Sequence, residues 1–536
     1  MRKQKLYEQY FKEFMELNPS TNLSLNLDEY KYLNGKYENT HSSIYKQQLH
    51  DFAVKYKLLI ESIPTKSRTI YEKMIFINCE NQLESEQFGL ERVPLSANEN
   101  EIAYLAEIAS GNSSVMLITK EDHINFISCL QELPKIVSSI IVQFKRGIND
   151  NFTLPKKLAN ELKNQMSSIL SEKAWINKNI KAKLSFDFNL ICTDIFEAEV
   201  SRLYSFLKTE YVSKCRNTIG LCGLKNGKKI YEFVVKQTLQ DKDISIEDIH
   251  NFGLFEVNRI HNELFELQED LGVKMSLQEF FKYMRNRKDL KFKSKKELLL
   301  MYKNQVRENK NHLIESLFFN NVKTKCLITP VPEFNEEFAS DAYYMEGDLK
   351  NKTPGQFFIN MKYFNTMNKT DIECLTLHET YPGHHYQISL VNESKKMPLF
   401  MKIFNVESYV EGWGLYCENL GNYSTPESYY GKLIMELMRA IRLVVDTGIH
   451  YYTWSYNKTF NYMKENGNES QTVIDDYITR YMSIPSQALA YKMGEKCMIE
   501  CLINFFNNGG VDIKEFHEKI LEDGPITLKL LREKFD

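Results

Sequence analysis

Three of the eleven histidines lie within eight residues of one another, in the segment His-Glu-Thr-Tyr-Pro-Gly-His-His that begins at position 378. Its first two residues, His378 and Glu379, match the start of the HExxH motif. In that motif two histidines one helical turn apart hold zinc, and the glutamate acts as a general base. The fourth residue after His378 is Pro382, which cannot bind a metal. The second ligand would therefore have to be His384 or His385.

A regular helix would bring neither of these histidines back to the metal. Position 384 would face roughly 120° away from His378, and position 385 would lie about 10 Å further along the axis. Pro382 removes a helical hydrogen bond, and Gly383 permits unusual backbone angles, so together they could bulge the helix. We favour His384 as the ligand and keep His385 as the alternative. The histidine that is left over would donate a hydrogen bond to the substrate.

A third ligand is expected from a second helix. Glu411 is the best candidate, because apolar and aromatic residues surround it in the segment Val-Glu-Gly-Trp-Gly-Leu-Tyr. A carboxylate there would complete a His-His-Glu site, which suits Zn2+. Glu407 and Glu418 lie one turn before and two turns after Glu411 and could share its face. The alternative interpretation is a set of ordinary histidines beside a helix kink and a solvated row of glutamates.

These residues must be positioned by a mostly helical chain. Only 13 prolines and 22 glycines interrupt its 536 residues, and stretches such as 244–271 carry apolar residues every three to five positions. Strand-like runs are few, and the best are residues 115–118 and 357–361. We therefore expect a mostly α fold with a small β-sheet beside the metal-binding helix.

The segment 324–355 changes character, because it contains Thr-Pro-Val-Pro and ends in Lys-Thr-Pro-Gly. Such a composition indicates irregular chain rather than a continuous helix. We place a boundary near residue 325, between a helical body at 1–325 and a catalytic, metal-binding part at 326–536. Both parts could close around one cleft.

Composition narrows the classes of function. Hydrophobic residues make up 43% of the chain, as in packed globular proteins. The formal net charge of −3 lacks the basic excess typical of nucleic-acid partners. No secretory signal and no run of about 18 apolar residues is evident, so we expect no membrane partner. The ten cysteines include no CxxC pair, which favours free thiols and a cytoplasmic location. Nothing in the sequence indicates an oligomeric state.

Several segments also resemble a known family. They are the octapeptide at 378–385, the Glu-Gly-Trp segment at 411–413, Pro-Gly-Gln-Phe-Phe-Ile-Asn at 354–360, and the stretches 439–450 and 485–494. Weaker similarity lies at 10–19 and 223–257, so the resemblance covers almost the whole chain. The family is a large bacterial one catalogued as a domain of unknown function. It carries a HExxPGHH signature and is regarded as a group of gluzincin-like zinc metallopeptidases.

The resemblance implies a large helical metallopeptidase-like fold, with zinc bound by His378, His384 and Glu411 and with Glu379 as the base. The signature does not itself distinguish His384 from His385. Two positions depart from the family pattern. Thr380 stands where alanine is usual, and Thr353 stands where arginine is expected, which could alter how a substrate is held.

Further residues are assigned roles in catalysis and substrate binding. With the family resemblance as the main support, Tyr491 is expected to donate a hydrogen bond to the oxyanion of the tetrahedral intermediate, with His450 as the second choice. A buried core tyrosine is the alternative. Asp446 lies four residues before His450 and could hydrogen-bond a ligand histidine from behind. Arg442 or Lys492 could clamp a substrate carboxylate, although an ion pair between Arg442 and Asp446 would explain both residues.

The strand expected at 357–361 could be an edge strand beside the metal helix. Such an edge holds an extended peptide by main-chain hydrogen bonds, and Phe358 and Asn360 would then contact the substrate. A short buried strand is the alternative. Taken together, the residues predict a zinc hydrolase, a peptidase acting on short peptides or peptide tails. A hydrolase of small non-peptide amides in specialised metabolism and a non-catalytic helical binding protein remain the other hypotheses.

Overall fold

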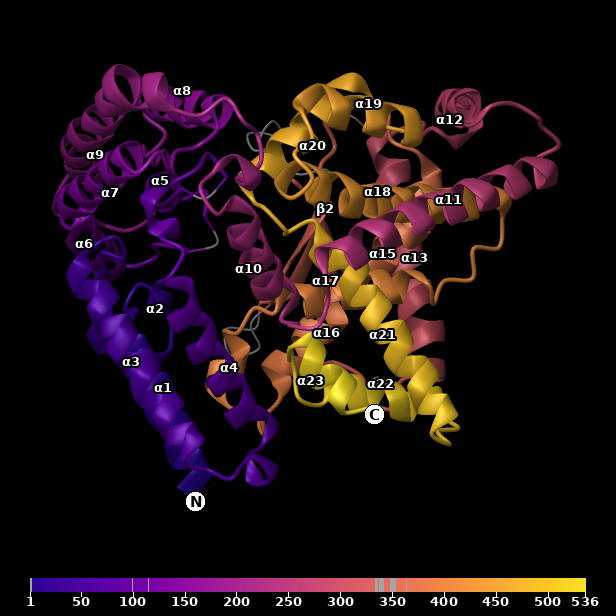
Figure 1. Cartoon of the computed structure of the whole chain (residues 1–536), viewed down its shortest axis with the longest axis horizontal. Helices are drawn as coiled ribbons and strands as arrows, with labels where there is room; N and C mark the ends of the chain where they lie inside the picture. Colours follow the sequence, from indigo (N-terminus) through magenta and orange to yellow (C-terminus); the bar gives the residue numbers. More distant parts are fainter. Residues whose placement is uncertain are drawn as a thin grey trace. The chain divides into compact units, whose positions relative to one another are not determined.

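The computed structural model describes residues 2–98, 100–113, 115–332, 336, 342–347, 353–362 and 364–536. Helices dominate and one small sheet is present, as the sequence predicts (Figure 1). The chain divides into two compact units, Met1–Ile230 with Met482–Ile484, and Tyr231–Tyr481 with Pro485–Asp536. The boundary expected near residue 325 falls inside the second unit.

The first unit is built from helices whose buried faces repeat at helical spacing. In α7, which packs against α9, Ile136, Ile140 and Phe144 are fully buried and recur every four residues, with the buried Val137 on the same face. The helices are α1 (Arg2–Leu17), α2 (Thr21–Leu25), α3 (Ser43–Glu61), α4 (Ile70–Ser85), α5 (Glu101–Ser110), α6 (Lys120–Leu130), α7 (Leu133–Asn149), α8 (Lys156–Glu172) and α9 (Phe188–Phe206).

The strand expected at 115–118 is wrong. The described residues of this segment form no regular element, and Met116 and Ile118 are mostly exposed. An apolar run becomes a strand only where another strand pairs with it, and the described strands all lie in the second unit.

The second unit holds the remaining helices. The helix expected at 244–271 is confirmed as α11, which packs against α18 so closely that a Cβ on Gly253 would lie 2.8 Å from Leu443 and Val444. No described helix is long and apolar enough to cross a lipid bilayer. The helices are α10 (Gly227–Leu239), which crosses the division, α11 (Ile246–Asp270), α12 (Leu277–Asn286), α13 (Lys295–Asn309), α14 (Glu315–Leu317), α15 (Ile372–Glu379), α16 (His384–Glu393), α17 (Glu407–Glu418), α18 (Pro426–His450), α19 (Tyr456–Asn466), α20 (Gln471–Ser483), α21 (Leu489–Asn507), α22 (Ile513–Leu521) and α23 (Leu528–Glu533).

The sheet has the strand order β1-β3-β2. Its central strand β3 (Gly355–Ile359) pairs in parallel with β1 (Cys326–Pro330) and antiparallel with β2 (Ala342–Met345). Phe357 and Ile359 of β3 are fully buried and join a core cluster that includes Ile372, the first residue of α15. The small sheet therefore lies beside the helix that carries His378, as expected. The segment 324–355 is nonetheless less irregular than predicted, because it contains β1 and β2.

Candidate metal centre

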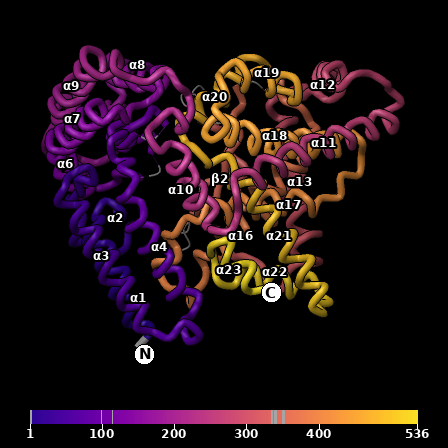
Figure 2. The backbone as a smooth tube through the Cα atoms, in the orientation of Figure 1, coloured from indigo at the N-terminus to yellow at the C-terminus, as the bar shows by residue number. Residues whose placement is uncertain are grey.

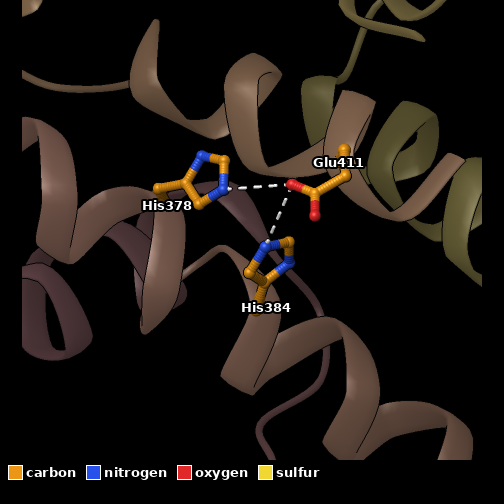
Figure 3. A group of neighbouring side chains, drawn as sticks. All are labelled: His378, His384 and Glu411. Atoms are coloured by element: carbon orange, nitrogen blue, oxygen red, sulfur yellow. Dashed lines mark ion pairs between the residues drawn. The ribbon is translucent and has the colours of Figure 1, made fainter. Parts of the chain in front are cut away.

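Three side chains from three helices meet at one point in the second unit (Figure 3). His378 lies at the end of α15, His384 is the first residue of α16, and Glu411 lies in α17. The Oε2 atom of Glu411 is 3.4 Å from Nε2 of His378 and 3.5 Å from Nε2 of His384. The three ligand atoms all lie within 4.8 Å of one another. The structure thus brings together the three residues whose types and spacing predict a metal site.

The chain reaches this geometry by ending one helix and starting another. Helix α15 stops at Glu379 and α16 begins at His384, so the segment is broken rather than bulged as expected. The Tyr381–Pro382 peptide bond is cis, and Trp413 Nε1 donates a hydrogen bond of 2.9 Å to the Pro382 carbonyl. A Cβ at Gly383 would lie 1.9 Å from the carbonyl oxygen of His378. Only glycine therefore lets the chain turn back here.

Close helix packing brings Glu411 to the two histidines. Helices α17 and α21 run side by side (Figure 2), and a Cβ on Gly412 would lie 2.5 Å from the backbone of Gly494 in α21. A Cβ on Gly414 would lie 2.6 Å from the imidazole of His378. The two glycines that flank Trp413 thus allow α17 to pack against both α21 and the His378 ring.

A second glutamate lies behind the first histidine. Oε1 of Glu418 is 2.8 Å from Nδ1 of His378, Cys374 donates to Oε2 of Glu418 over 3.1 Å, and Arg439 lies 3.4 Å from Oε1. Burial alone would raise the pKa of Glu418, but Arg439 and His378 hold this pKa below its ordinary value. Because the carboxylate accepts the Nδ1 hydrogen, Nε2 of His378 is the ring atom that faces Glu411 and that a metal would bind.

The role expected for Asp446 is wrong. Its carboxylate accepts hydrogen bonds from the Tyr231 hydroxyl, at 2.5 Å, and from the Ser486 amide, at 3.0 Å. Burial raises the pKa of Asp446 to about 7, against the lowering effect of these two hydrogen bonds. Glu418 could have been recognised from the sequence, since it lies two turns after Glu411 on the same face.

The cluster of ligand atoms favours a positive charge at its centre. Burial lowers the pKa of His378, but the carboxylates of Glu411 and Glu418 outweigh it and raise this pKa to about 10. The same pairing with both histidines holds the pKa of Glu411 well below its ordinary value despite burial. Oε2 of Glu411 and Nδ1 of His384 are buried without a hydrogen-bond partner. Such unsatisfied atoms around a site that favours a cation fit a divalent metal ion.

His385 does not belong to this group of ligands. It is fully buried, with Nδ1 3.0 Å from the hydroxyl of Tyr344 in β2 and Nε2 3.0 Å from the hydroxyl of Tyr381. Burial, with a smaller contribution from Lys310, lowers its pKa to about 4 and keeps the imidazole neutral. The expectation that His385 donates to the substrate is wrong, because both ring nitrogens are taken. Through Tyr344 it links β2 to α16 instead.

Glu379 and Tyr491 both lie near the ligands. Glu379 follows His378, is partly exposed, and forms no hydrogen bond with the described residues. Its charge acts on both His378 and Cys326. Burial first, and then the nearby charge of Glu411, raise the pKa of Tyr491, so its phenol stays protonated.

His450 and Lys492 are engaged elsewhere, and the expectations for both are wrong. Nε2 of the fully buried His450 is 2.9 Å from the carbonyl of Tyr481. Lys492 is buried among three carboxylates, at 2.6 Å from Glu436, 2.7 Å from Glu495 and 3.0 Å from Glu256. Neither side chain is available to a substrate. The three partners of Lys492 come from α11, α18 and α21, so sequence spacing could not reveal two of them.

The expectation that the strand at 357–361 is a free edge for a substrate peptide is also wrong. Because β3 is the central strand, its main chain already pairs on both sides. Phe358 stacks on Tyr343 with ring centroids 5.1 Å apart, and Asn360 donates to the carbonyl of Glu336 over 2.7 Å. Phe358 and Asn360 therefore make contacts within and next to the sheet, and its described edge strands are β1 and β2.

The chain matches the family described as bacterial protein of unknown function, DUF885, over residues 20–535. A comparison with curated proteins finds no match. Among solved structures, a candidate lipoprotein from Colwellia psychrerythraea is similar with a TM-score of 0.84 and 20% identity, over 99% of this chain and 98% of that one. A candidate lipoprotein of unknown function from Shewanella oneidensis has a TM-score of 0.75 and 15% identity, with 98% of each chain covered. At these identities the likeness concerns the fold alone. Because the family match spans nearly the whole sequence, the chain belongs to the DUF885 family of bacterial proteins.

Proposed function

We propose that this protein is a zinc-dependent hydrolase, a metallopeptidase that cleaves amide bonds of short peptides or peptide tails. The observation that carries the proposal is the convergence of His378, His384 and Glu411, whose ligand atoms lie within 4.8 Å of one another. Two imidazoles and one carboxylate are a ligand set that zinc prefers in hydrolases. A Zn2+ ion held there would polarise a substrate carbonyl and make water more acidic.

Glu379 is the proposed general base. It is next to a ligand in sequence, and its carboxylate is partly exposed with no hydrogen-bond partner among the described residues. It can therefore take a proton from the attacking water and pass it to the leaving amine. A purely structural metal site would have no use for a free carboxylate in this position.

Tyr491 is the proposed donor to the oxyanion. Burial and the charge of Glu411 raise the pKa of its phenol, so the hydroxyl keeps a hydrogen to donate. The amide of Gln487 lies 3.5 Å from this hydroxyl and donates, so it leaves the phenolic hydrogen free. A protonated phenol beside a metal ligand can stabilise negative charge that develops on the carbonyl oxygen.

The edge strand β2 supports a peptide as the substrate. Within the described sheet it pairs with β3 alone, and Tyr344 binds it to His385, the residue after a ligand. An extended peptide could add to this edge by main-chain hydrogen bonds, on a strand that contacts the residue next to His384. A small amide without a peptide backbone would gain nothing from the edge.

The variant Glu379→Gln tests the proposal. We expect it to bind one zinc ion per chain like the wild type, but to hydrolyse a library of quenched fluorescent peptides about 10²- to 10⁴-fold more slowly. Zinc is measured by atomic emission after dialysis. Glu269→Gln, an exposed position in α11, is the matched control and should behave like the wild type. Full activity of the Glu379→Gln variant would eliminate the mechanism.

A further inference from the structure

Arg442 in α18 is a largely buried cation that has no carboxylate partner in the part of the chain that the structure describes. Among the described residues, its guanidinium contacts the sulfur of Met438 at 3.6 Å and the rings of Tyr477 and Tyr491 at 5.7 and 5.0 Å from their centroids. Its Nε atom is buried without a hydrogen-bond acceptor. The residue as a whole is partly exposed, so it is not sealed inside the core.

The two fully buried cations among the described residues of this unit are both paired. Arg439, one turn earlier in α18, lies on Glu418, and Lys492 lies among three glutamates. Asp446 lies one helical turn after Arg442, but its carboxylate accepts hydrogen bonds from Tyr231 and Ser486 instead. An unpaired buried charge is costly and is expected to have a partner. Among the described residues, tyrosines alone stabilise the charge of Arg442, so its guanidinium is available to an anion that is not part of this structure.

A second unsatisfied donor lies beside the guanidinium. The buried hydroxyl of Tyr481 has no hydrogen-bond partner among the described residues other than the Arg442 guanidinium. Burial raises the pKa of this phenol, and Arg442 lowers it by its charge and by that hydrogen bond. Because the guanidinium can only donate, the phenol keeps its own hydrogen for another acceptor. A guanidinium fork and a phenol together offer three or more donors. That set matches a planar carboxylate, which accepts two parallel hydrogen bonds from arginine.

This arrangement adjoins the metal centre. The ring of Tyr491 lies 5.0 Å from the Arg442 guanidinium and within electrostatic reach of Glu411. Both Arg442 and Glu411 thus lie near the same tyrosine, so a substrate whose amide bond reached the ligands could bring a neighbouring group to Arg442.

We infer that Arg442 and Tyr481 form a receptor for a carboxylate of the substrate, so that the enzyme prefers amides that carry a free carboxylate near the scissile bond. The inference rests on the proposed function, because it assigns the substrate class of the same site. The carboxylate can be the C-terminus of a peptide or the side chain of an acidic residue. Both sources share the same chemistry.

Binding to the Glu379→Gln protein tests the receptor without turnover. The probes are a blocked tripeptide with a free C-terminal carboxylate and the same tripeptide as its C-terminal amide, titrated by calorimetry. A second pair, both amidated, carries Glu or Gln at the middle position. In one of the two pairs, we expect the peptide with the carboxylate to bind roughly 10²-fold more tightly than its uncharged counterpart. If this is the first pair, the receptor binds a C-terminal carboxylate. If it is the second pair, the receptor binds an acidic side chain.

In the Glu379→Gln protein, the further substitution Arg442→Gln should reduce the ratio of the two affinities, charged over uncharged peptide, to about 1. Tyr481→Phe keeps the aromatic ring but loses the hydroxyl, so it should reduce this affinity ratio in part. It also provides the test if the Arg442→Gln protein fails to fold. Arg307→Gln, an exposed position in α13, is the control and should change nothing. Equal binding of acids and neutral matches, or discrimination that survives in both variants, overturns the inference. Absence of any peptide hydrolysis by the wild type would instead contradict the proposed function, while the binding result would still stand.

Discussion

Glu418 determines the orientation and the hydrogen bonding of the His378 ring, which would bind a metal through its other nitrogen. Its carboxylate is 2.8 Å from Nδ1 of the imidazole, and Cys374 and Arg439 occupy its remaining acceptor positions. Because Glu418 is buried and anchored, it fixes both the tautomer and the orientation of the ring. A negative charge behind the imidazole also makes the opposite nitrogen a better ligand.

The variant Glu418→Gln is therefore expected to weaken zinc binding about 10- to 100-fold. The amide can still accept the Nδ1 hydrogen, but the charge that strengthens the ligand is lost, and Arg439 loses its counterion. Competition with a fluorescent chelator measures the affinity. Glu515→Gln, exposed in α22, provides the control. An unchanged affinity for Glu418→Gln would show that the carboxylate does not act through His378.

At the scale of elements, the site depends on how closely three helices approach. The break between α15 and α16 returns His384 to His378, and Gly412 and Gly414 let α17 bring Glu411 against them. The two glycines lie one residue either side of Trp413 but meet different neighbours. Gly412 faces the backbone of Gly494, whereas Gly414 faces the imidazole of His378.

This difference predicts two distinct phenotypes for the same substitution. Gly→Ala in a helix gains up to about 1 kcal/mol from propensity at either position. At Gly412 the new methyl would meet rigid backbone at 2.5 Å, so we expect overpacking to destabilise the metal-free protein by roughly 1–3 kcal/mol. At Gly414 it would displace the His378 ring, so zinc affinity should fall with a smaller loss of metal-free stability. Urea unfolding and chelator competition on both variants separate the effects, and wild-type zinc affinity of Gly414→Ala would contradict the prediction.

Local patterns predicted most elements and the three side chains that converge, but not the pairings between distant segments. The periodicity of 244–271 was enough for α11, and the proline and glycine between His378 and His384 were enough to indicate a distortion. The position of β3 in the centre of its sheet depends on β1 and β2, which no pattern within 357–361 can reveal. Lys492 was misassigned for the same reason, since two of its carboxylate partners come from other helices.

At the scale of the whole molecule, everything assigned to the chemistry lies in one of the two units. His378, His384, Glu411, Glu379 and Arg442 all fall within Tyr231–Tyr481, and Tyr491 lies in the C-terminal stretch Pro485–Asp536 of the same unit. None of the described residues of the first unit belongs to the candidate metal centre. Ligand binding stabilises the part of a protein whose folding creates the site, and units of a chain can open independently.

We therefore expect zinc to protect the two units unequally. At a free zinc concentration about 1,000 times the dissociation constant, binding adds roughly 4 kcal/mol to the stability of the unit that forms the site. Hydrogen exchange followed by mass spectrometry should show slower exchange in peptides from α15, α17 and α21 on adding zinc, and no change in peptides from α3 and α4. His378→Ala, which removes a ligand, should abolish the protection. Equal protection of both units would mean that the chain unfolds as a single cooperative body, and protection confined to α3 and α4 would place the zinc site elsewhere.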